Sequence, residues 1–180
     1  RVRSLVPTRE VRGILGDEFG IRPEDIRWVT FEDAHVAEYK DPPFAERARP
    51  GSDMMAMLRS GELDAVIVGN DKPVSADLKD VYPDAEAAGR QFKEKHGFVP
   101  VNHVVVVRQS TLDAQPDAVM TFYRAVESIW KELPKGSALP LGRAEIEPSI
   151  ELALRYISAQ KMLPKAMTPS EVWSGVPAGL

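Results

Sequence analysis

The chain has 180 residues, of which 43% are hydrophobic and 28% charged, and its formal net charge is −4. This composition is typical of one soluble globular domain or two small ones. The absence of cysteine excludes disulfides, thiol catalysis and cysteine-ligated metals, the negative charge without a basic cluster argues against nucleic-acid binding, and no apolar run is long enough to span a membrane.

The first 107 residues alternate strand and helix patterns. Apolar runs predict strands over residues 1–6, 26–31, 63–69 and 101–108. The run 63–69 is continuously apolar, as in strands that are buried on both faces of a parallel sheet.

Helices are predicted between these strands from apolar spacing and from end signals. They cover residues 8–19 with Thr8 as N-cap and Gly20 as stop, a short segment capped by Ser52 and ended by Gly61, and residues 84–95. A strand–helix–strand–helix–strand order predicts the α/β class. We expect a doubly wound, mostly parallel sheet with right-handed crossovers.

Beyond residue 107 the pattern is helical only. Helices are predicted over 113–133 and 149–162, and Thr168-Pro-Ser-Glu171 reads as a capping box that opens a last short helix. These helices have apolar faces but no sheet of their own to cover. They either pack on the first sheet or require a partner element that is absent from this chain.

Polar side chains follow the predicted strands, where open α/β sheets bind ligands. Ser4 and Thr8 follow the first strand, at a helix start whose free N–H groups suit an anion. The second and third strands are followed by Glu32, Asp33 and His35, and by Asn70 and Asp71. The fourth begins at Asn102 and His103. The alternative interpretation is that these residues are caps and turn formers, a common use of Asp, Asn, Ser and Thr.

His35 is the first candidate for a general acid or base. Its intrinsic pKa lies near neutrality, and Glu32 and Asp33 stand close to it in sequence. A surface histidine in a polar turn is the plain alternative, and a core or hinge histidine is the plain alternative for His103. A divalent metal would need Asp33 and His35 to be joined through folding by Asp71 and His103. No Walker loop, GxGxxG, GxSxG or HExxH motif occurs.

Several longer motifs resemble one known family. They are Val2-Arg-Ser4 leading into Val11-Arg-Gly-Ile-Leu15, Trp28-Val-Thr-Phe-Glu-Asp-Ala-His-Val36, Gly61-Glu-Leu-Asp-Ala-Val-Ile-Val-Gly-Asn-Asp71, Val101-Asn-His-Val-Val-Val-Val107, and the ending from Tyr156 through Gln160 to Thr168-Pro-Ser-Glu171. Together they are similar to the 4,5-dihydroxyphthalate decarboxylase family over nearly the whole chain.

The resemblance implies a type 2 periplasmic-binding-protein fold with two lobes and a ligand between them. Residues 1–107 would then be the α/β second lobe. Residues 108–180 would be a helical return segment of the first lobe, whose N-terminal part is absent here.

The resemblance also implies non-oxidative decarboxylation of an aromatic dicarboxylate to protocatechuate and CO₂ in the cytoplasm. The proton donor would be His35 or His103, and Glu32, Asp33 or Asp71 would orient the catechol hydroxyls. Carboxylate-binding candidates are Arg3, Ser4, Thr8, Asn70 and, beside His103, Asn102. No organic cofactor is called for. The rival hypothesis is a non-catalytic, periplasmic solute-binding protein for a small carboxylate, because one scaffold serves both uses.

Overall fold

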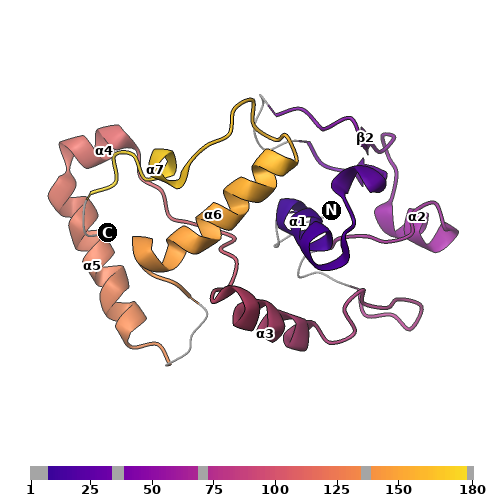
Figure 1. The fold of residues 1–180 in the computed structure, drawn as a ribbon, viewed down its shortest axis with the longest axis horizontal. Helices are drawn as coiled ribbons and strands as arrows, with labels where there is room; N and C mark the ends of the chain where they lie inside the picture. The colour runs from indigo at the N-terminus through magenta and orange to yellow at the C-terminus, as the bar shows by residue number, and fades with distance from the viewer. Residues whose placement is uncertain (1–7, 34–38, 69–72, 135–138, 178–180) are drawn as a thin grey trace. The chain divides into compact units, whose positions relative to one another are not determined.

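The computed structural model describes residues 8–33, 39–68, 73–134 and 139–177 (Figure 1). This part of the chain is mostly helical and carries one small two-stranded parallel sheet. Its helices are α1 (Thr8–Phe19), the 3₁₀ turn η1 (Pro23–Asp25), α2 (Met54–Ser60), α3 (Ala85–His96), α4 (Gln109–Ala114), α5 (Pro116–Lys131), α6 (Arg143–Ala159) and α7 (Pro169–Val172). No helix in these ranges is long and apolar enough to cross a bilayer.

The chain divides into two compact units. The first comprises Arg1–Asp80 with Ala153–Ala166, and the second comprises Val81–Leu152 with Met167–Leu180. Helix α6 contributes its first part to the second unit and its last part to the first unit. The proposed lobe boundary after residue 107 stays a prediction.

Helix α1 has the predicted bounds. Val11, Ile14 and Leu15 are spaced to share one face, and each is at least partly buried. The helix ends because Gly20 adopts a positive φ of 67° and donates its N–H to the Gly16 carbonyl oxygen at 3.0 Å.

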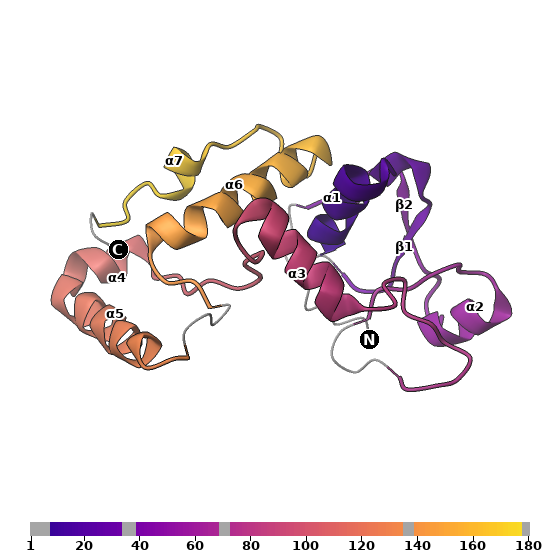
Figure 2. The same ribbon diagram turned by 60° about the horizontal axis from the view of Figure 1, so that its bottom comes forward.

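The sheet consists of β1 (Trp28–Thr30) and β2 (Ala45–Arg47), which run parallel with Trp28 opposite Ala45 and Thr30 opposite Arg47 (Figure 2). β1 lies inside the strand predicted at 26–31. β2 was not predicted, because its three residues lie in a Pro- and Arg-rich segment that reads as a loop. The parallel pair places the carboxyl ends of both strands at one edge of the first unit.

The doubly wound sheet is not observed in the described residues. Residues 63–68 and 101–108, both predicted as strands, have no regular secondary structure. β-propensity mainly reflects how well a side chain packs on a half-buried sheet, and a strand also needs a partner for its N–H and C=O groups. The valines at 104–107 accordingly remain 53%, 82%, 83% and 47% exposed. The strand predicted at 1–6 lies outside the described residues.

Helix ends account for most other boundaries. Asp53, and not the predicted Ser52, caps α2 by accepting from the Ala56 N–H at 2.6 Å, and Gly61 ends this helix with a φ of 80°. In the second unit, Asp84 caps α3 by accepting from the Ala87 N–H at 2.8 Å. The capping box at Thr168 is present with Pro169 at the first turn of α7.

The helix predicted over 113–133 is split into α4 and α5. Pro116 begins α5, and the ring of a proline disfavours helical torsions in the residue before it. Gln115 accordingly has φ −141° and ψ 56°. Helix α6 starts at Arg143, earlier than predicted, and accommodates Pro148. Leu152 and Tyr156 of α6 are the buried apolar side chains of the described chain.

Candidate functional site

The sequence-predicted site residues fall into three groups. Arg3, Ser4, His35, Asn70 and Asp71 lie outside the described residues. Thr8 is the first residue of α1. Glu32, Asp33, Asn102 and His103 are described.

Glu32 and Asp33 come together on one cation at the carboxyl edge of the sheet. Arg47, the last residue of β2, donates from Nη1 to the Glu32 carbonyl oxygen at 2.6 Å and to Oδ1 of Asp33 at 2.9 Å. Its Nε donates to Oδ2 of Asp41 at 2.9 Å. Arg47 therefore closes the turn after β1, and Glu32 takes part through its backbone.

Asn102 and His103 belong to the second unit, in the irregular segment before α4. Asn102 is half-buried and His103 is exposed. Among the residues that the structure describes, no three His, Asp or Glu side chains are grouped so that they could hold a metal ion. His35 and Asp71 of the hypothetical metal set are not among those residues.

The first unit contains a buried cation that sequence reasoning missed. Arg12 of α1 is only 5% exposed, and its guanidinium carbon lies 4.4 Å from the ring centroid of Trp28 and 5.9 Å from that of Phe44. Trp28 opens β1 and Phe44 directly precedes β2, so the sheet pairing positions both rings. The guanidinium thus lies over two aromatic rings, an arrangement that favours a desolvated cation.

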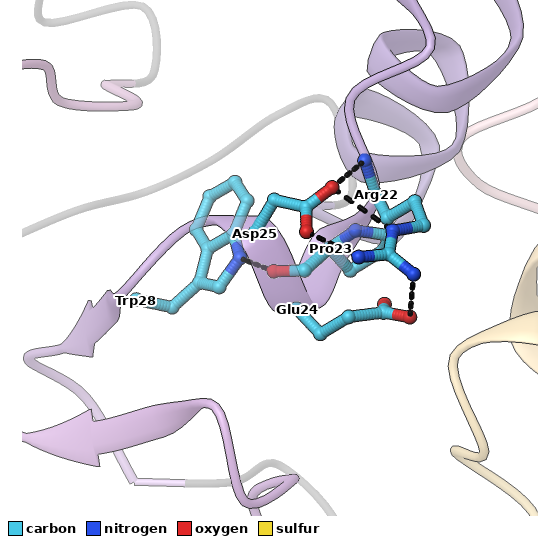
Figure 3. A network of polar contacts seen from close by, with 5 residues as sticks. All are labelled: Arg22, Pro23, Glu24, Asp25 and Trp28. Atoms are coloured by element: carbon cyan, nitrogen blue, oxygen red, sulfur yellow. Dashed lines mark hydrogen bonds and ion pairs between the residues drawn. The ribbon is translucent and has the colours of Figure 1, made fainter.

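A short network fixes the indole of Trp28 (Figure 3). Its Nε1–H donates to the Pro23 carbonyl oxygen at 2.8 Å. The turn at Pro23 is closed by Arg22, whose Nε and Nη2 donate to the Asp25 carboxylate at 3.0 and 2.7 Å. These hydrogen bonds from Arg22 lower the pKa of Asp25, which is the sign of a carboxylate stabilised in its charged form.

The electrostatics of Arg12 are incompletely compensated. Burial lowers the pKa of the Arg12 guanidinium, whereas Tyr39 and the charge of Asp41 act in the opposite direction. The Nε of Arg12 is buried and has no hydrogen-bond partner in the described part of the chain. A buried donor without a partner typically costs about 1–3 kcal/mol, more when charged.

A second cluster holds α1 against the end of α6 within the first unit. Asp17 accepts from Arg155 Nη1 and Nη2 at 3.0 and 2.6 Å, and from the Tyr156 hydroxyl at 2.7 Å. Tyr156 is 3% exposed, and burial, together with the hydrogen bond to Asp17, raises its pKa. The ring of Tyr156 lies directly over Gly13, the neighbour of Arg12. This cluster therefore fixes the helix that carries the buried cation.

Comparison with known proteins adds one relative. The chain is 24% identical over 182 residues to 4,5-dihydroxyphthalate decarboxylase from Comamonas testosteroni, in a match that covers 91% of this chain and 51% of that protein. It is a distant homologue of that protein, as the motifs in the sequence indicated. The chain spans about half the length of the curated relative it matches. No family model matches the chain.

Proposed function

We propose that the chain is part of a carboxy-lyase that removes one carboxyl group, as CO₂, from a small aromatic dicarboxylate such as 4,5-dihydroxyphthalate. The observation that carries this proposal is the distant homology, which extends over 91% of the chain to a protein named for that reaction. The candidate site residues would supply the proton donor and the carboxylate-binding groups that the reaction requires.

The reaction needs a place for the electrons of the breaking bond. A hydroxyl para to the departing carboxylate donates electron density to the ring carbon that bears it, and a general acid protonates that carbon. The carbon–carbon bond then breaks, its electron pair restores the aromatic ring, and CO₂ leaves. The added proton remains in the product, protocatechuate. An apolar wall beside the departing carboxylate favours this step because it disfavours the charge.

We assign the proton donor to His35 or His103, since a histidine titrates near neutral pH. Asp33 is a candidate to orient the catechol hydroxyls, and the Arg47 contact that holds its carboxylate at the carboxyl end of β1 supports this role. Glu32 and Asp71 are the other candidates for that role. Arg3, Ser4, Thr8, Asn70 and Asn102 stay candidates for carboxylate binding.

Turnover of 4,5-dihydroxyphthalate tests the proposal. The full chain is incubated with this acid, with and without a divalent metal ion, and protocatechuate is followed by its ultraviolet spectrum. His35→Gln and His103→Gln are compared with His96→Gln, a matched control whose ring stacks on Phe92 at the end of α3. Loss of the proton donor should lower kcat by about 10²- to 10⁴-fold, while His96→Gln should retain activity.

Two other results would be informative. Turnover that is equally fast in both histidine variants would exclude the assigned donors but not the reaction. Saturable binding of the acid with no release of CO₂ would refute the carboxy-lyase and identify a solute-binding protein, which needs no titrating group in its site.

A further inference from the structure

We propose that the buried guanidinium of Arg12 is the anchor for a carboxylate of the ligand. The choice of an aromatic dicarboxylate as that ligand rests on the proposed function, whereas the anion site itself rests on the surroundings of Arg12.

Arg12 differs in its exposure from other arginines of the first unit. Arg47 is 43% exposed at its side chain and contacts two carboxylates, and Arg155 is 54% exposed and binds Asp17 with two nitrogens. Arg12 is 5% exposed. Removing a guanidinium from water without giving it a hydrogen-bonded counterion is unfavourable, because the aromatic rings replace only part of the hydration that is lost.

Asp41 compensates the charge of Arg12 only in part. Asp41 influences the charge of Arg12, but its Oδ2 accepts from Nε of Arg47 at 2.9 Å. Tyr39 also favours the charged form of Arg12 and acts against the lowering of its pKa by burial. The first unit therefore holds a buried positive charge whose own carboxylate partner is not provided by the described residues.

The position of the unsatisfied atom indicates the ligand class. A guanidinium that stacks on aromatic faces directs its N–H bonds outward in the plane of the group. The Nε–H and one Nη–H form a fork that matches the two oxygens of a carboxylate. Within the described part of the chain the Nε of Arg12 lacks a partner, and the guanidinium carbon lies over the rings of Trp28 and Phe44. A carboxylate that bound edge-on would satisfy the Nε without disturbing the stacking.

Binding of phthalate is the direct test, because this acid carries the carboxylates without the reactive hydroxyls. The Nε–H signals of arginine are recorded by nuclear magnetic resonance during a phthalate titration of the full chain. The Arg12 signal is assigned by its loss in Arg12→Lys. We expect it to move saturably with phthalate and to stay unchanged with the neutral amide phthalamide.

Calorimetry provides the matched measurement. Arg12→Gln should bind phthalate about 10- to 100-fold more weakly, the range expected for a charge-assisted hydrogen-bonded pair. Arg59→Gln, which removes an exposed guanidinium that pairs with Asp77 at 3.0 Å, should bind within about threefold of the unmodified chain, the small change expected for an exposed ion pair.

The proposal is overturned if phthalate does not bind, if Arg12→Gln binds it normally, or if the Arg12 Nε–H signal does not move at saturation. The test by the Arg12 Nε–H signal is made on the unmodified chain, so it does not depend on whether Arg12→Gln folds. Arg12-dependent phthalate binding without any decarboxylation would support the anchor and refute the carboxy-lyase. Decarboxylation with an unchanged KM in Arg12→Gln would support the carboxy-lyase and refute the anchor.

Discussion

Gly13→Ala tests the packing that fixes the arginine-bearing helix. A Cβ at position 13 would overlap the ring of Tyr156. Overpacking costs about 1–3 kcal/mol, and displacement of the ring would weaken its hydrogen bond to the Asp17 carboxylate, worth about 1.5–3 kcal/mol. Replacement of a helical glycine by alanine returns about 1 kcal/mol. We therefore expect the free energy of unfolding to fall by about 1.5–5 kcal/mol, with the upper end reached only if the hydrogen bond is lost completely.

The control lies in the same helix. At Gly16 a Cβ would meet only the Ile21 carbonyl oxygen, at 3.7 Å, so Gly16→Ala should be neutral or stabilising by up to about 1 kcal/mol. Both variants are measured by urea unfolding, followed by circular dichroism and by tryptophan fluorescence, and the m-values are compared to check for two-state behaviour. If Gly13→Ala is as stable as Gly16→Ala, the ring of Tyr156 does not lie over Gly13. Replacing the ring by a smaller side chain in Tyr156→Leu should lower the loss of stability that Gly13→Ala causes. A double-mutant cycle measures this coupling.

Two further predictions concern a titrating side chain and a helix cap. Because burial and the bond to Asp17 raise the pKa of Tyr156, the folded chain keeps this proton above pH 10, where the unfolded chain loses it. The free energy of unfolding should therefore fall as the pH rises above about 10, by no more than about 1.4 kcal/mol per pH unit, and urea titrations at pH 8 and pH 11 should show a smaller fall in Tyr156→Phe. Asp84→Ala removes the cap of α3 and should cost about 1 kcal/mol in the same assay. Asp84→Asn, which keeps an acceptor, should cost clearly less, and equal losses in the two variants would contradict the capping role.

The helices were the predictable part of this fold, because their signals are local. Gly20 was sufficient to predict the end of α1, whereas Thr8, predicted as its N-cap, is its first helical residue. Gly61 and the Thr168 capping box were also correctly identified. Errors arose where one residue decides a boundary. Asp53 and Ser52 are both good caps, and Pro116 moves the start of α5 past the predicted residue 113 by keeping Gln115 out of the helical conformation.

Strands were predicted less well, because pairing is not a local property. Residues 63–68 and 101–108 have strong β-propensity, yet the described structure gives them no partner. The unpromising segment that includes Ala45 pairs with β1 instead. Whether a segment becomes a strand depends on its position in the sheet and on the strands beside it, and neither can be read from a single apolar run.

The site was only partly predictable. Glu32 and Asp33 were chosen as candidates because they follow a strand, and the structure brings both to Arg47, while their role in a site stays a prediction. Arg12 was missed, because an arginine in an amphipathic helix normally faces water. A weak signal was available in retrospect, since Arg12 lies between the apolar Val11 and the pair Ile14 and Leu15.

The exposed valines at 104–107 affect how the chain behaves in concentrated solution. Four consecutive β-branched side chains without charge have the composition of segments that form intermolecular cross-β contacts. Pro100 before the segment and Arg108 after it are residues that interrupt such stacking, the proline because it lacks an N–H and the arginine because like charges repel. We therefore expect these two residues to act as gatekeepers, so that their replacement promotes aggregation of the chain.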